Sequence, residues 1–170
     1  MCGIAGFIGK QRINKQRIKK GCDAMNHRGP DDSGLFSKDY KTISIVLGHK
    51  RLSIIDLDSR SKQPFYFDNS VLIFNGEIYN FLKIRNELIE LGHYFKTSSD
   101  TEVLSHALRQ WGTKALNKLE GMWAFAWFDI KKNELILSRD RFGEKPLYIW
   151  KTNEGIFFAS EIQALKKIVG

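Results

Sequence analysis

Short stretches of alternating or uniformly apolar residues predict β-strands along much of the chain. The stretch 43–56 (ISIVLGHKRLSIID) places Ile43, Ile45 and Leu47 on one face of a strand. The run 71–74 (VLIF) is short and wholly apolar, which is typical of a strand buried on both faces. Short polar segments join two further pairs of apolar runs and predict two hairpins, 122–129 with 134–140 and 146–150 with 155–160.

A spacing of three and four residues between apolar positions predicts α-helices elsewhere. After the 71–74 run, four apolar side chains share one helical face before Gly92 ends the helix, namely Phe81, Ile84, Leu88 and Leu91. Ser99 and Glu102 have the spacing of a capping box, which starts a second helix that Gly112 closes. Further helices are predicted at 17–25, 115–119 and 161–170. Hairpins combined with consecutive helices favour a layered α+β domain in which helices cover stacked sheets.

The length and composition indicate one domain with its own core. The chain has 170 residues, of which 42% are hydrophobic, and its longest uncharged apolar run, 122–128, is too short to span a bilayer. Charged residues follow the first nine positions too soon for a secretory signal. The two cysteines fit a reducing compartment better than a disulfide scaffold, so we expect a cytoplasmic protein. Cys22 shares a helical face with Ile18 and Met25 and is expected in the core.

The chain is basic, with a formal net charge of +8, and much of this charge lies in the segment 10–20 (KQRINKQRIKK). Such a run is most often a solvated helix face or a patch for a neighbouring domain. It can also bind nucleic acid, but no recognition module accompanies it here. The four histidines are dispersed without the spacing of metal ligands, which argues against a metal enzyme: they are His27, His49, His93 and His106.

Cys2 directly follows the initiator methionine. Cysteine is small enough for ordinary removal of Met1, which would leave a thiol and a free α-amine on the same residue. An ordinary chain-terminal amine has a pKa of about 7.7–8.0, so part of it is neutral near pH 7 and can act as a base. This pair is the N-terminal version of a nucleophile with its own base. Taken alone, however, the position of this cysteine is better explained by chance.

Asn75 and Gly76 follow the predicted buried strand 71–74. An Asn-Gly pair is typical of a hairpin turn, but the next segment has helical periodicity, which weakens that interpretation. In the functional interpretation, the Asn75 side-chain amide and the Gly76 N–H are paired donors for the oxyanion of an acyl-transfer intermediate. Loss of one such donor typically lowers the rate by about 10²–10³.

Two charged residues could recognise an amino acid. Arg51 lies in an otherwise apolar strand region, where it is either an edge charge or a bidentate ligand for a carboxylate. Asp100 lies at a predicted helix start, where it either caps the helix or holds an ammonium group. Together they could bind both ends of an α-amino acid if the fold brings them close to each other.

Eight sequence blocks, in order over nearly the whole chain, resemble the class II glutamine amidotransferase domain. Within that family they are most similar to the N-terminal glutaminase domain of glutamine-hydrolysing asparagine synthetases. The blocks are MCGIAGFIG, NHRGPDDSG, LGHKRLSIIDL, FNGEIYNF, SSDTEVL, GMWAFAWFD, SRDRFGEKPLY and FASEIQAL.

The resemblance implies catalytic roles for three residues. Cys2, after loss of Met1, would attack the side-chain amide of glutamine. Its own α-amine would be the general base and would later protonate the departing ammonia. Asn75 and Gly76 would form the oxyanion hole.

Four more residues acquire substrate-binding roles from the same resemblance. Arg51 would bind the α-carboxylate of glutamine and Asp100 its α-ammonium group. Glu77 would help to hold the amide or amino nitrogen of the substrate. Arg28 belongs to a block that the family uses to shape the pocket, although the block is also compatible with a simple turn.

The family relationship also implies a fold, products and partners. The expected fold is the four-layer αββα sandwich of N-terminal nucleophile hydrolases, with residues 1–170 as the glutaminase domain. Glutamate and ammonia would form through a γ-glutamyl thioester, without a cofactor or metal in this domain. Ammonia would pass to an ATP- and Mg²⁺-dependent synthetase domain or subunit, whose SGGxDS phosphate loop does not occur in this chain. Aspartate is the default acceptor by resemblance.

Other interpretations stay open at this stage. One is a catalytically inactive domain of the same fold that binds a partner, and another is a nucleic-acid-binding module that uses the segment 10–20. The sequence does not establish the oligomeric state, a homodimer included, and it predicts no association with a membrane.

Overall fold

The computed structural model describes residues 1–52 and 62–170, and its strands form two antiparallel sheets. The first sheet has the order β2-β3-β1-β9-β8 and the second the order β4-β5-β6-β7. The first contains β1 (Gly3–Gly9), β2 (Asp32–Asp39), β3 (Ser44–Arg51), β8 (Tyr148–Lys151) and β9 (Gly155–Ala159). The second contains β4 (Phe65–Phe67), β5 (Ser70–Ile78), β6 (Gly121–Asp129) and β7 (Glu134–Arg139).

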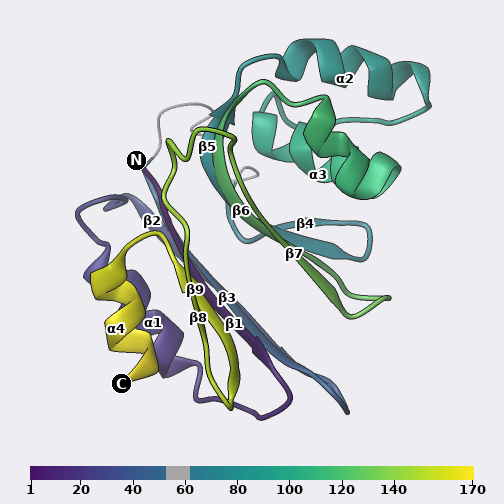
Figure 1. The fold of residues 1–170 in the computed structure, drawn as a ribbon. Coiled ribbons are helices and arrows are strands. Elements are labelled where there is room, and N and C mark those ends of the chain that lie inside the picture. The colour runs from purple at the N-terminus through teal and green to yellow at the C-terminus, as the bar shows by residue number, and fades with distance from the viewer. Residues whose placement is uncertain (53–61) are drawn as a thin grey trace.

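Helices cover the outer face of each sheet, so the molecule has four layers (Figure 1). One outer layer holds α1 (Gln16–Ala24) and α4 (Ile162–Val169), and the other holds α2 (Phe81–Glu90) and α3 (Asp100–Trp111). The predicted αββα sandwich is therefore confirmed, as are the two predicted hairpins, β6 with β7 and β8 with β9.

Three apolar clusters hold the four layers together. Ile4 and Leu47 of the first sheet meet Ile73 and Ala126 of the second sheet between the two sheets. The other two clusters lie between each sheet and its own helices. Successive side chains of a strand point to opposite faces, so Phe74 packs under the helices while its neighbour Ile73 faces the other sheet. The central strands are thus buried on both faces, as the wholly apolar run 71–74 predicts.

Asn75 and Gly76 were expected just after the apolar run 71–74, but the strand that contains this run is longer. It extends from Ser70 to Ile78, so both residues lie within β5 rather than in a turn, and the next helix starts only at Phe81. Gly76 faces Trp123 of β6, and a Cβ atom at this position would come within 2.2 Å of the Met122 carbonyl oxygen. Only glycine allows the two strands to approach each other this closely.

Several other details differ from the sequence prediction. Leu91 is 54% exposed, so it does not continue the buried face of α2. The segment predicted as a helix at 115–119 is a 3₁₀ helix, Gly112–Asn117. The predicted strand region 43–56 ends as β3 at Arg51, and its last residues lie outside the described part of the chain.

The cysteine predicted in the core is indeed buried. Cys22 is 4% exposed and lies on α1 beside Ile18 and Met25. Burial, followed by the charge of Asp23, raises the pKa of the Cys22 thiol to about 12, so this thiol stays protonated and unreactive at neutral pH.

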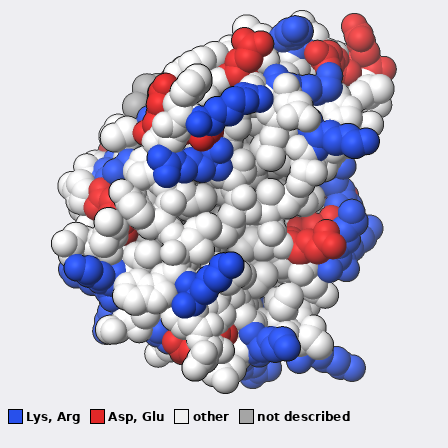
Figure 2. Space-filling view, viewed as in Figure 1, with Lys and Arg blue, Asp and Glu red and all other residues white. Residues whose placement is uncertain are grey.

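The basic segment 10–20 is only partly a solvated surface. Arg17 turns inward, where it pairs with Glu154 at 2.7 Å and donates to the carbonyl oxygens of Ile168 and Val169 at the end of α4. On the face shown in Figure 2, basic and acidic side chains alternate around a broad uncharged area rather than forming one continuous basic patch.

The described residues contain neither a membrane-spanning helix nor a cluster of metal-ligating side chains. Among residues 1–52 and 62–170, no helix combines the length and apolar character needed to cross a bilayer. In the same ranges, no three His, Cys, Asp or Glu side chains converge in a way that could hold a metal ion.

Candidate active site

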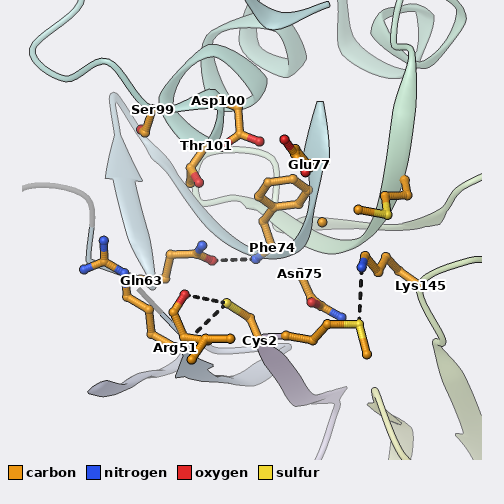
Figure 3. A pocket seen from close by; sticks show the side chains of 14 residues that line it. Cys2, Arg51, Gln63, Phe74, Asn75, Glu77, Ser99, Asp100, Thr101 and Lys145 are labelled. Carbon is orange, nitrogen blue, oxygen red and sulfur yellow. Dashed lines mark hydrogen bonds between the residues drawn. The ribbon is translucent and has the colours of Figure 1, made fainter. Parts of the chain in front are cut away.

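A single cavity gathers most of the predicted site residues at the end of the sandwich where the N-terminus lies (Figures 1 and 3). Strands from both sheets and the first turn of α3 form its walls. Six of the seven residues predicted from the sequence line it, and these are Cys2, Arg51, Asn75, Gly76, Glu77 and Asp100.

The Cys2 thiol contacts the backbone of Leu52, the residue that directly follows β3. Its sulfur accepts a hydrogen bond from the Leu52 N–H at 3.4 Å, and its S–H donates to the Leu52 carbonyl at 3.7 Å. These two contacts, drawn in Figure 3, fix the sulfur at the edge of the cavity just before β1 begins. Met1, the first residue of the sequence, also lines the cavity.

The Asn75 side chain carries a buried donor without a partner. The residue is 2% exposed, and among the described residues no atom accepts a hydrogen bond from its Nδ2. Leaving a buried polar group unsatisfied costs about 1–3 kcal/mol. Asn75 lines the same cavity as Cys2, so this unpaired donor lies at the wall of that cavity.

The Gly76 N–H also faces the cavity side of its strand. Trp123, which lies opposite on β6, uses its own N–H and C=O to bind Asp140, at 3.3 and 2.8 Å. Gly76 and Trp123 are therefore a non-hydrogen-bonded pair of the antiparallel ladder. The Gly76 N–H consequently points away from β6, to the other edge of β5. This edge borders the cavity that Gly76 lines.

Asp100 presents a half-buried carboxylate at the opposite wall. Ser99 caps α3 by accepting from the Glu102 N–H at 3.3 Å, which places Asp100 in the first helical turn. Burial, opposed by hydrogen bonds and reinforced by the nearby charge of Glu77, raises the pKa of Asp100 to about 6. Among the described residues Asp100 makes no salt bridge, so a cationic ligand would relieve the cost of burying its charge.

Arg51 reaches the cavity from the end of β3, on the side of Cys2, while Asp100 stands across from it on α3 (Figure 3). The arginine is 8% exposed, which is unusual for this residue type. The fold thus brings a cation from the first sheet and a carboxylate from an outer helix to one cavity, as the recognition of an α-amino acid requires.

Arg28 is the one predicted site residue that does not line the cavity. Its Nε donates to the Cys2 carbonyl at 3.0 Å, and its guanidinium pairs with Glu161 at 3.0 Å. Arg28 therefore holds the backbone of the N-terminal segment instead of facing the cavity.

Further residues line the cavity that were not among the predicted site residues: Gln63, Ser99, Thr101, Met122 and Lys145. Lys145 is 7% exposed, and its Nζ lies 3.3 Å from the Met1 sulfur. Its only signal in the sequence is membership of the block SRDRFGEKPLY. Gln63 stands outside all eight blocks, so no sequence signal pointed to it.

Comparison with known proteins establishes the family. The model of the family described as "Glutamine amidotransferase domain" matches residues 1–170. Asparagine synthetase [glutamine-hydrolyzing] 3 of Bacillus subtilis is 38% identical over 97% of this chain and 27% of its own length. A putative asparagine synthetase of Methanocaldococcus jannaschii is 40% identical over 97% of this chain and 35% of its own length. The chain belongs to the glutamine amidotransferase domain family, and it spans about a third or less of the curated relatives it matches.

Solved structures share the fold over nearly the whole chain. The glutamine phosphoribosylpyrophosphate amidotransferase of B. subtilis has a TM-score of 0.81 and 25% identity, and the match covers 99% of this chain and 44% of that protein. An allosteric regulatory enzyme of purine biosynthesis has a TM-score of 0.83 at 24% identity over 99% of this chain and 43% of its own, which shows the fold alone. The four layers are those of the N-terminal nucleophile amidotransferases.

Proposed function

We propose that this domain hydrolyses the side-chain amide of L-glutamine to glutamate and ammonia through a γ-glutamyl thioester on Cys2. The unpartnered Nδ2 of the buried Asn75, in the cavity that Cys2 also lines, is the observation that carries the proposal. An N-terminal nucleophile needs such a donor for its tetrahedral intermediate, and the family membership supports the same chemistry.

The proposed reaction begins with hydrolytic removal of Met1, which frees the Cys2 α-amine. The amine takes the thiol proton, and the thiolate attacks the amide carbon of glutamine. The oxyanion that forms accepts hydrogen bonds from Asn75 Nδ2 and the Gly76 N–H. The protonated amine then gives its proton to the leaving nitrogen, and ammonia departs. Water, activated by the same amine, hydrolyses the thioester, releases glutamate and restores the thiol.

Charged side chains around the cavity would select glutamine. Arg51 would bind its α-carboxylate, and Asp100 would bind its α-ammonium group. Glu77 is close enough to interact electrostatically with Asp100 and would also attract the ammonium group of the substrate. A substrate that brings an ammonium group would restore full ionisation of the half-buried Asp100 carboxylate.

The ammonia is proposed to serve a synthetase domain or subunit that activates an acceptor with ATP and Mg²⁺. Support comes from the curated relatives, which are named asparagine synthetases and are about three to four times as long as this chain. Aspartate is the proposed acceptor on this ground, and a cytoplasmic location is proposed from the low number of cysteines.

The test measures glutamate and ammonia release from glutamine by protein whose mass shows loss of Met1. Cys2→Ala is expected to abolish turnover without unfolding the domain. Cys22→Ala is the matched control, because that thiol is buried and protonated, and it is expected to keep turnover. Acid quenching during turnover should trap a glutamyl adduct on Cys2. Turnover retained in Cys2→Ala, or no turnover by processed wild-type protein, would refute the proposal, and the latter result would favour an inactive partner-binding domain.

A further inference from the structure

The cavity-side edge of β5 is covered by two side chains where the neighbouring strand stops. β4 pairs with β5 only as far as Phe65, which lies opposite Leu72. Two residues further along β5, the Phe74 N–H donates to Gln63 Oε1 at 2.6 Å (Figure 3), and the Phe74 carbonyl binds His49 Nε2 at 3.1 Å. Both backbone groups of Phe74 on this edge are therefore satisfied by side chains rather than by a strand.

The end of β4 explains why a side chain takes over here. The strand pairing stops at Phe65, so no backbone carbonyl of β4 pairs with the Phe74 N–H, and the side chain of Gln63 supplies the acceptor instead. The acceptor must be the amide oxygen, because the Phe74 N–H is a donor.

His49 reaches Phe74 from the other sheet. It lies on β3 and is 1% exposed, so its hydrogen bond links the two sheets directly. Burial lowers the pKa of His49 to about 4, which keeps the ring neutral at pH 7. A neutral ring that donates from Nε2 has an unprotonated Nδ1, and among the described residues that Nδ1 has no partner. The ring thus makes a single directed contact, to Phe74.

The position of Phe74 determines where the Gly76 N–H lies. Along a strand, the N–H groups of alternate residues point to the same edge, so those of Phe74, Gly76 and Ile78 share one edge. Gln63 accepts from the first and Asp100 accepts from the last, at 3.0 Å. The Gly76 N–H stands between these two fixed points and faces the cavity.

From this arrangement we infer that Gln63 and His49 are positioning residues for the oxyanion hole. By holding both backbone groups of Phe74, they place the Asn75 amide and the Gly76 N–H at the distance that the developing oxyanion requires. The inference rests on the proposed glutaminase function. A purely structural role would instead stabilise the strand edge without any particular effect on the chemical step.

The first test compares Gln63→Met with Ser70→Ala in protein lacking Met1. Methionine has a similar length but no acceptor for the Phe74 N–H. Ser70→Ala removes a hydrogen bond of similar kind, from Ser70 Oγ to the Phe67 carbonyl at 2.6 Å, at the far end of the same strand. Gln63→Met is expected to lower kcat about tenfold with little change in KM, because a donor displaced by a fraction of an ångström stabilises the transition state less. Ser70→Ala is expected to keep the wild-type kcat.

Alkylation of Cys2 by iodoacetamide distinguishes a displacement of the oxyanion donors from a general disturbance of the active site. This displacement at a saturated carbon forms no oxyanion, so its rate should stay within about twofold of wild type in Gln63→Met. An unchanged kcat, or an alkylation rate that falls together with kcat, would overturn the inference. Absence of glutamine hydrolysis by the wild-type protein would instead refute the proposed function.

If Gln63→Met does not fold, a pair of variants at His49 decides the question. His49→Gln keeps a nitrogen donor for the Phe74 carbonyl, whereas His49→Leu removes it. The inference expects a lower kcat in His49→Leu than in His49→Gln, at equal KM and equal alkylation rates. Equal kcat values in the two variants would contradict it.

Discussion

The Ile78 N–H donates a hydrogen bond to Asp100 Oδ2 across 3.0 Å, and this contact ties the end of β5 to the first turn of α3. The carboxylate proposed to hold the substrate ammonium group is thus anchored to the strand that carries the two oxyanion donors, Asn75 and Gly76. The groups proposed to recognise the α-amino group and to stabilise the intermediate are therefore linked through one hydrogen bond between α3 and β5.

The raised pKa of the Asp100 carboxylate predicts a pH dependence of glutamine binding. Because the pKa of Asp100 in the empty site is raised to about 6, this group loses its charge as the pH falls below that value. In a processed Cys2→Ala variant, which cannot turn over, the Kd for glutamine should rise by about tenfold near pH 5, since one pH unit corresponds to a factor of ten. Titration calorimetry at several pH values measures this change. Asp100→Asn in the same background should bind weakly at every pH, and a Kd independent of pH in the parent variant would contradict the assignment.

The same carboxylate should lower the stability of the empty domain. A folded pKa above the unfolded value of 3.8 means that the contribution to stability is full below about pH 4 and is lost as the pH rises through about 6. Asp100→Asn is therefore expected to raise the free energy of unfolding near neutral pH while it weakens glutamine binding. Urea denaturation without glutamine measures the effect. A variant less stable than wild type above pH 7 would show that the Ile78 contact outweighs the cost of burial.

Asn75 and Arg51 should affect different kinetic constants. Asn75→Ala removes a donor that serves only the transition state, so kcat should fall by about 10²–10³ with little change in KM. The fold should tolerate it, because Nδ2 has no partner among the described residues to lose. Arg51→Ala should mainly raise KM, since a carboxylate is bound in both the ground state and the transition state. Steady-state kinetics measure both constants. A KM effect in Asn75→Ala together with a kcat effect in Arg51→Ala would mean that the two roles are exchanged.

Part of this site could be predicted from the sequence because some of its residues lie at the end of a predicted strand or at the start of a predicted helix. Asn75 follows a wholly apolar run, and Asp100 follows a capping serine, so their local positions were readable. Cys2 and Arg51 became interpretable only through the family resemblance, because 49 positions separate them and the fold alone brings them to one cavity.

Other features depend on contacts that no local pattern reports. The edge strand β2 is mostly exposed and polar, and β1 is rich in glycine, so neither has strand periodicity. Gln63 acquires its role from the backbone of Phe74 on another strand. Arg17 lies in a run of charges that predicts a solvated surface, yet it turns inward because the carbonyl groups at the end of α4 need donors.

Retention of Met1 should inactivate the domain without unfolding it. Acylation of the Cys2 nitrogen removes the proposed base, and Met1 itself lies in the cavity, with its sulfur 3.3 Å from Lys145 Nζ. A chain extended by a protease-cleavable peptide before Cys2 should release no ammonia above background, and cleavage that exposes Cys2 should restore turnover. Since Met1 is 55% exposed, thermal unfolding should change little between the two forms. Full turnover by the extended chain would eliminate the α-amine as the base.

Two buried histidines should make the domain sensitive to acid. Burial lowers the pKa of both His49 and His106 from 6.5 to about 4, and His106 is enclosed between the rings of Phe67 and Phe95. Of the charged groups near His106, Glu102 opposes this shift, whereas His93 and Arg85 add to it.

The sign of the effect follows from proton binding. Between about pH 6.5 and 4 these two histidines are protonated in the unfolded chain and neutral in the folded one, so stability is full above 6.5 and is lost as the pH falls. Asp100 has the opposite slope in part of this range, but one carboxylate is outweighed by two histidines. His106→Phe keeps a ring between the neighbouring aromatics and should make the loss of stability between pH 7 and pH 5 clearly smaller in urea denaturation. A His106→Phe curve as steep as that of the wild type would assign the acid sensitivity to other groups.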